Sequence, residues 1–153
     1  MKNIITIKKI SFQDRFLKSC LDFVFVVYIF FTIISALVSL YLSLFFVVMI
    51  GYYISKRYKE SLIYITDILY SGEDKKVIFL YGYRDNFDLK IEKDCSSFQV
   101  ERFNQLKGIE KTKIVFTEKY KTFLTQFEVG DWNNDNFEKI ERFYLNVKAN
   151  TSN

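Results

Sequence analysis

Three pairs of neighbouring carboxylates have the spacing that comes closest to acid–base or metal chemistry. The members of each pair are one to four residues apart, and the pairs are Glu73/Asp74, Asp85/Asp88 and Asp131/Asp135. Each pair falls at a turn or at the start of a helical pattern, where carboxylates commonly cap backbone groups and stay solvated. We therefore interpret them as capping and surface residues.

Other residue types that carry chemistry are scarce. The chain has no histidine, which is the commonest general base and metal ligand. Cys20 and Cys95 are too far apart for a zinc site, and so low a cysteine count suits a reducing compartment. The five glycines form no phosphate loop, and no serine stands in a nucleophile elbow. The sequence predicts a protein that is not an enzyme and needs no metal or cofactor.

An uncharged apolar run at residues 23–55 dominates the N-terminal third of the chain. A run of 18 or more apolar residues is typical of a membrane span, and a buried helix of a soluble protein is the alternative. One straight helix of this length would reach about 50 Å, whereas a bilayer core is ~30 Å thick. We therefore expect two spans, at about 15–35 and 40–57, joined by a turn in which Ser35, Ser39 and Ser43 satisfy freed backbone groups.

Basic residues flank this run on both sides. They are Lys8, Lys9, Arg15 and Lys18 before it, and Lys56, Arg57 and Lys59 after it. A hairpin places both flanks on one side of the membrane, as the positive-inside rule favours. The pattern predicts an integral protein of the bacterial cytoplasmic (inner) membrane, with both termini cytoplasmic. From residue 61 onward, 14 basic residues face 15 acidic ones, which argues against nucleic-acid binding.

The N-terminal segment, residues 1–20, has two interpretations. Ile5 and Ile7 alternate with polar neighbours, which suits a short strand up to about Lys9. Ser11 then stands three residues before Asp14, as in a capping box that would begin an interfacial helix. A disordered basic leader is the alternative.

Residues 58–149 change to a strand period. Alternating or β-branched stretches predict five to seven antiparallel strands, among them "KVIFLYGYR", "FDLKIEK", "FQVERF", "KIVFTEKY" and "TFLTQFEV". Turn signals such as "SGED", "RDN", "KDCSS" and "LKG" separate them. Residues 61–70 could be the first strand or an extension of the second membrane helix. Apolar residues at helical spacing then predict one helix over about 135–149, with Asp135 and Glu138 as its capping box, followed by a tail at 150–153.

The predicted architecture is therefore a membrane-anchored α+β protein. Residues 21–57 form a transmembrane helical hairpin, and a small antiparallel β-barrel or sheet closed by one C-terminal helix follows it. The stretch "FLTQFEVGDWNNDNFEKIERFYLNV" and this order of elements resemble small bacterial membrane proteins with a pleckstrin-homology-like (PH-like) domain, including the YcxB-like group. The resemblance implies a fold of many uses and no catalytic residues. In "SGEDKK" this chain lacks the basic loop cluster of the lipid-binding members.

Several residues are candidates for contact with a partner. Trp132, the single tryptophan, could anchor an interface or could pack beside Phe137 over the open end of the sheet. The other candidates are Tyr28 and Tyr41 in the spans and Arg84, Lys90 and Arg102 in the domain.

Function is expected to be non-catalytic. The first hypothesis is an accessory or assembly subunit of a larger membrane protein complex, with other membrane proteins and lipid as partners and homo-oligomers as a further possibility. The alternatives are a stand-alone sensor that binds lipid headgroups or a cytoplasmic ligand at the membrane surface, and a membrane-resident immunity or stress protein.

Overall fold

The computed structural model of the chain describes residues 1–104 and 111–151, and confirms an α+β protein. The predicted turn "LKG" lies outside these residues, as do positions 152–153 of the predicted tail. The elements run in the order β1 (Lys2–Thr6), α1 (Phe12–Cys20), α2 (Phe23–Val38), α3 (Leu40–Ser61), β2 (Ile63–Ser71), β3 (Lys76–Tyr83), β4 (Asn86–Asp94), β5 (Phe98–Phe103), β6 (Lys113–Glu118), β7 (Lys121–Phe127) and α4 (Asn134–Thr151).

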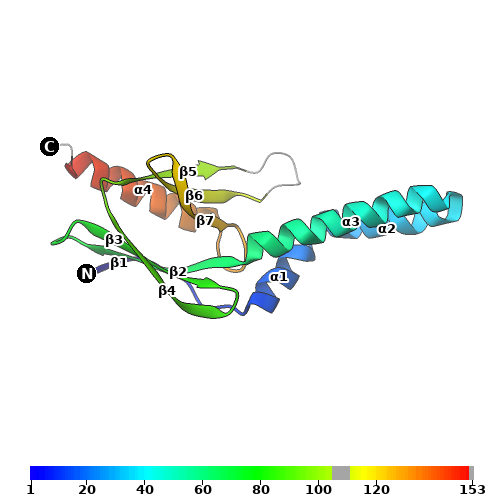
Figure 1. Cartoon of the computed structure of the whole chain (residues 1–153), viewed down its shortest axis with the longest axis horizontal. Helices are drawn as coiled ribbons and strands as arrows, with labels where there is room; N and C mark the ends of the chain where they lie inside the picture. The colour runs from blue at the N-terminus through cyan, green and yellow to red at the C-terminus, as the bar shows by residue number, and fades with distance from the viewer. Residues whose placement is uncertain (105–110, 152–153) are drawn as a thin grey trace.

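The strands form two antiparallel sheets, with the orders β1-β2-β3-β4 and β5-β6-β7. Residues 63–71 are therefore a strand, and the alternative that they extend the second helix is wrong. The alternation predicted for "FDLKIEK" is present in β4: its apolar residues are half-buried and its polar residues are exposed, apart from the half-buried Lys93. The C-terminal helix α4 contacts β1 and β5, one edge strand of each sheet, and so covers the opening between them (Figure 1).

The core between the sheets is rich in aromatic rings. Phe79 of β3 contacts Phe116 of β6 with ring centroids 4.8 Å apart, and Phe98 of β5 at 5.7 Å. One buried polar residue also joins the sheets: the backbone N–H of Ile65 in β2 donates to Gln126 Oε1 in β7 (2.7 Å). Because this N–H lies beside a bulge in β2, a side chain replaces the strand partner it lacks.

Local capping signals set the ends of the helices. The Ser11 hydroxyl accepts from the N–H of Asp14 (3.1 Å) and donates to its carboxylate (2.8 Å), which confirms the predicted start of α1. The predicted capping box of the last helix is wrong: Asn133 caps α4 by accepting from the N–H of Asn136 (3.0 Å). The side-chain amide of asparagine reaches a free N–H of the first turn as readily as a carboxylate does.

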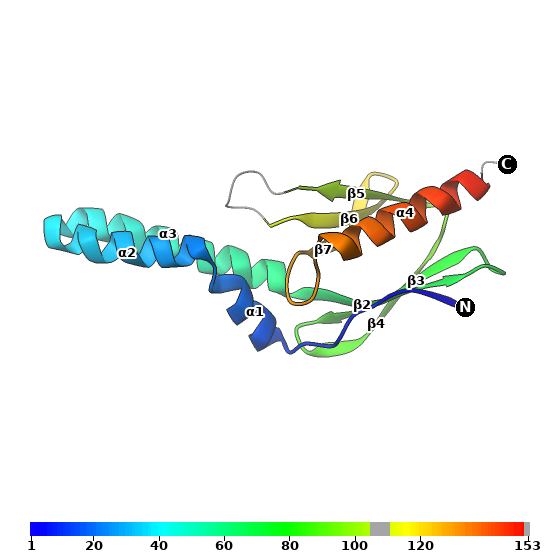
Figure 2. The ribbon, with the colours of Figure 1, turned by 180° about the vertical axis from the view of Figure 1, so that it is seen from behind.

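Helices α2 and α3 lie side by side and extend together away from the β domain (Figures 1 and 2). Ser39 joins them, and the buried hydroxyls of Ser35 and Ser43 donate to the carbonyls of Thr32 (3.0 Å) and Leu40 (2.8 Å). By length and composition α3 is a candidate membrane span. The expected first span is not one straight helix, because a bend of 59° separates α1 from α2 where Asp22 caps α2.

Candidate functional site

Two of the predicted carboxylates, Asp74 and Asp85, form hydrogen bonds at turns. The hydroxyl of Ser71 donates to Asp74 (2.9 Å) in the turn after β2. Asp85 accepts the backbone N–H of Phe12 (2.5 Å), and so fastens the start of α1 to the β3–β4 turn. No group of three or more His, Cys, Asp or Glu side chains within residues 1–104 and 111–151 could hold a metal ion.

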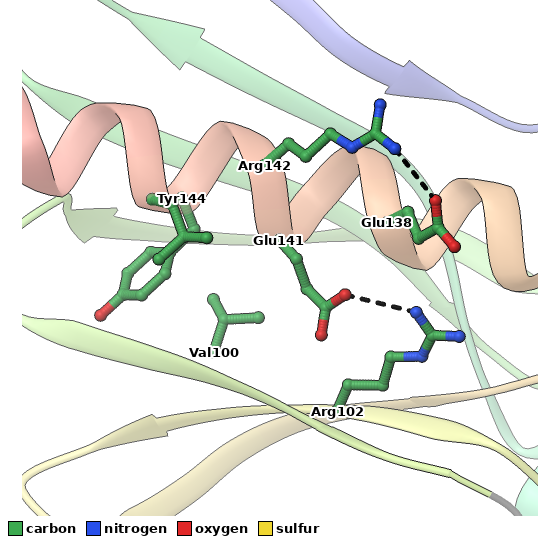
Figure 3. A pocket seen from close by; sticks show the side chains of 7 residues that line it. Val100, Arg102, Glu138, Glu141, Arg142 and Tyr144 are labelled. Carbon is green, nitrogen blue, oxygen red and sulfur yellow. Dashed lines mark hydrogen bonds and ion pairs between the residues drawn. The ribbon is translucent and has the colours of Figure 1, made fainter.

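A groove between β5 and α4 is the site that best suits a partner (Figure 3). It measures about 560 Å³, within the range of natural ligand pockets. Its lining residues come from one edge strand and one flank of the helix: Val100, Arg102, Glu138, Glu141, Arg142, Tyr144 and Leu145.

Charges of both signs alternate around this groove. Arg102 Nη1 lies 3.3 Å from Glu141 Oε2, and Nη2 donates to the Asn134 side chain (2.9 Å). Arg142 and Glu138 form a second pair, at 3.2 Å on the exposed face of α4. The Arg142–Glu138 pair is solvent-exposed and contributes only ~0–1 kcal/mol, so an incoming backbone or side chain can replace it at low cost, whereas the Arg102–Glu141 pair is half-buried.

The strand that lines the groove, β5, is an edge strand of its sheet. Among the residues that the structure describes, β5 pairs only with β6, and the hydroxyl of Tyr144 donates to the Phe98 carbonyl (2.9 Å) near the start of β5. Val100, Tyr144 and the exposed Leu145 add apolar surface beside this edge. An unpaired strand edge next to a partly apolar groove can receive an extended peptide segment.

Five of the six predicted contact residues lie away from this groove. Trp132 is 2% exposed, donates to the Ile65 carbonyl (2.9 Å) and stacks on Phe137, so it is a core residue and not an interface anchor. Its indole finds an apolar neighbour and an acceptor inside the domain, which explains its burial. The other four are scattered: Tyr28 packs against Tyr53, Tyr41 is exposed on the helix pair, Arg84 contacts Tyr58, and Lys90 pairs with Glu92. Arg102 alone lines the groove.

The basic flanks divide into two groups. Lys8, Lys9, Lys18 and Lys59 are exposed and Lys56 is half-buried, as residues near headgroups would be. Arg15 and Arg57, also predicted as basic residues of the membrane flank, differ from the lysines because they are buried, at 0% and 1% exposure. Each fits inside because the fold supplies oxygen acceptors and aromatic rings for its guanidinium.

Arg15 fastens the helices to the β domain, and Arg57 fastens α3 to the bend between α1 and α2. Arg15 donates to the carbonyls of Ser61 (3.2 Å) and Arg84 (2.8 Å), and its guanidinium lies 4.7 Å from the Tyr64 ring. Arg57 pairs with Asp22 (3.1 Å) and Glu60 (2.7 Å).

The other six groove residues were not predicted as contact residues from the sequence: Val100, Glu138, Glu141, Arg142, Tyr144 and Leu145. A signal for part of the set exists, because Glu138, Glu141 and Leu145 recur at steps of three and four and so share one helix flank. Nothing in the sequence shows that β5 lies beside that flank. Comparison with known proteins does not identify these residues either: no family model matches the chain, and searches of curated proteins and of solved structures find no match.

Proposed function

We propose that this protein is a non-catalytic, membrane-anchored interaction module, an accessory subunit of a larger membrane protein complex. In this proposal α2 and α3 lie in the membrane, both chain ends face the cytoplasm, and the β domain holds an extended segment of a partner in the β5–α4 groove.

One observation carries the membrane part of the proposal: α2 and α3 expose large apolar side chains around their surface. Leu37 is 85% exposed, Tyr41 86% and Phe45 57%, and only 17% of the most apolar stretch of α3 is buried. The core helix of a soluble protein would be mostly buried, and an exposed apolar surface of this kind marks contact with lipid or with other proteins.

The β domain supports the interaction part. Its balance of 14 basic and 15 acidic residues gives it little general attraction to anionic membranes. The groove offers a strand edge, apolar surface and charges of both signs instead, which suits a polypeptide. Two antiparallel sheets closed by a C-terminal helix are also compatible with the PH-like fold that the resemblance implies.

The test is purification of the full chain from native membranes in mild detergent, with every co-purifying protein quantified. The variant Leu145→Lys places a charge in the groove at a residue that is 64% exposed, and Asn146→Lys places the same charge on an exposed neighbour that does not line the groove. We expect one partner at a fixed ratio for the wild type and for N146K. We expect at least tenfold less partner with L145K, because burying an unpaired charge in an interface disfavours binding.

Two results would refute parts of this proposal. Release of the chain from membranes by alkaline carbonate would refute the proposal that α2 and α3 anchor it in the membrane. Recovery of the wild-type chain alone, or only as a homo-oligomer, would refute the role of accessory subunit and favour the stand-alone sensor.

A further inference from the structure

A second cavity, which we call the junction cavity, lies where the helices meet the β domain. It measures about 410 Å³. Its lining comes from α1, the α1–α2 bend, α3, and the segments before β6 and α4, and includes Lys18, Ser19, Asp22, Arg57, Lys111, Glu128 and Trp132. None of these residues lines the β5–α4 groove.

Two buried polar atoms of this lining lack a hydrogen-bond partner. Ser19 and Arg57 are each 1% exposed, and neither Ser19 Oγ nor Arg57 Nε makes a hydrogen bond to the part of the chain that the structure describes. A buried polar group without a partner costs ~1–3 kcal/mol, and such groups usually mark the place of a water, an ion or a ligand. Both atoms can donate a hydrogen bond, which favours a ligand rich in acceptor oxygens.

The charge of the cavity also favours an anion. Lys18, Arg57 and Lys111 face Asp22 and Glu128. Asp22 is already engaged, because one oxygen accepts from the N–H of Phe25 (3.1 Å) and the other from Arg57 (3.1 Å). A smaller adjoining cavity of about 220 Å³ shares Lys111 and adds Lys56, Lys59, Lys113 and Glu60. Six cationic and three carboxylate side chains line the two cavities together, a formal excess of +3.

Lys111 is held close to other charges. Burial and the nearby Arg57 lower the pKa of its ammonium group below the ordinary value, while Glu60, Asp22 and Glu128 partly offset this effect. An anion bound between Lys111 and Arg57 would stabilise both charged side chains, since opposite charges favour the ionised form. The free protein therefore gathers cationic groups that an anionic ligand would stabilise.

We propose that the junction cavity binds a phosphate group, with Lys18, Lys111 and Arg57 as its cationic partners and Ser19 as a hydroxyl donor. A phosphate group offers several acceptor oxygens to these donors, and both lysine and arginine commonly bind phosphate in proteins. The group could belong to an anionic lipid headgroup or to free phosphate. If α2 and α3 span the membrane, the base of the pair lies at headgroup level, where basic pockets hold anionic lipids. The phosphate site itself does not depend on that span.

Trp132 provides the readout, because it lines the cavity and is the only tryptophan of the chain. The full chain in a neutral detergent is titrated with inorganic phosphate, and separately with a short-chain phosphatidic acid, while the fluorescence of Trp132 is followed. A saturable change with either probe supports the phosphate site. Binding of the lipid alone assigns the site to a headgroup, and binding of inorganic phosphate assigns it to free phosphate.

Lys111→Gln and Ser19→Ala test the assignment to this cavity. Ser19 Oγ has no hydrogen-bond partner in the part of the chain that the structure describes, so S19A removes no such bond from the fold, and Lys139→Gln on the exposed face of α4 is the matched control. We expect at least tenfold weaker binding for K111Q, as the loss of one charge-assisted hydrogen bond implies, a several-fold loss for S19A, and no change for K139Q. Absence of saturable binding with both probes, or equal affinity of K111Q and wild type, would overturn the proposal.

Discussion

Replacement of Arg15 by methionine separates its two interpretations, a flanking membrane charge and a structural clamp. As a flanking charge, Arg15 would affect membrane orientation and leave the fold intact. As a buried clamp, it holds α1 against the end of α3 and the β3–β4 turn. We expect Arg15→Met to destabilise the folded protein by about 3 kcal/mol.

The magnitude follows from the contacts. Arg15 donates to the carbonyls of Ile10, Ser61 and Arg84, and hydrogen bonds from a charged donor contribute ~1.5–3 kcal/mol each. No carboxylate among the described residues forms an ion pair with it, so removal of the charge also relieves several kcal/mol of desolvation. Methionine refills part of the volume between the rings of Tyr64 and Phe87. The difference leaves about 3 kcal/mol, or roughly 10 °C in melting temperature for a chain of this size.

The assay is thermal unfolding of the purified full chain in mild detergent, followed by circular dichroism. Arg142→Met is the matched control, because the Arg142 side chain is 78% exposed and makes a single surface ion pair. We expect this control to melt within about 2 °C of the wild type.

Equal melting temperatures for R15M and R142M would refute the clamp. Arg15→Lys gives a further check, because lysine keeps the charge but cannot reach three carbonyls with one planar group. A lysine variant as stable as the wild type would show that charge alone, and not the guanidinium geometry, is what the site requires.

Two further predictions concern the core of the β domain. Burial raises the pKa of Tyr64 to about 12, against ~10 in an unfolded chain, so the native state holds this proton more tightly. The stability it contributes, ~2–3 kcal/mol, is present below pH 10 and is lost as the pH rises through about 12. Urea unfolding at pH 9 and pH 11.5 measures this effect. Between these two pH values the free energy of unfolding should fall less for Tyr64→Phe than for wild type, whereas the exposed control Tyr120→Phe should match the wild type. Gln126→Ala should lower the free energy of unfolding by ~2–4 kcal/mol, because it leaves the N–H of Ile65 buried and unpaired. Hydrogen exchange at the Ile65 amide should also accelerate. An unchanged exchange rate would contradict this role of Gln126.

Local patterns predicted most of the secondary structure because the burial pattern or the cap of each element is written in residues close together in the chain. The alternation in "FDLKIEK" predicted β4 since one of its faces packs on the core, and the spacing of Phe137, Ile140 and Tyr144 predicted α4 since these side chains lie on its inner face. Ser11 and Asp14 predicted the start of α1 because a capping box involves only neighbouring residues.

The buried arginines could not be predicted in the same way. A lysine- and arginine-rich flank beside an apolar run ordinarily means surface charge, and Arg57 follows that pattern in sequence. Its burial depends on Asp22, which is 35 residues away and reaches it only because α3 folds back along α2. The β5–α4 groove is also a product of tertiary structure, because its two sides are separated in the chain by β6 and β7.

The position of the clamps has a consequence for the proposed function. Arg15 joins α1 to the end of α3 and to the β3–β4 turn, and Arg57 joins α3 to the bend between α1 and α2. A single residue, Leu62, separates α3 from β2, so no flexible linker intervenes between the helix pair and the sheet. If α2 and α3 are embedded in a membrane, these contacts fix the height and orientation of the β5–α4 groove above it. A partner segment would then be bound at a set distance from the bilayer, which suits an assembly subunit better than a tethered domain that searches the cytoplasm.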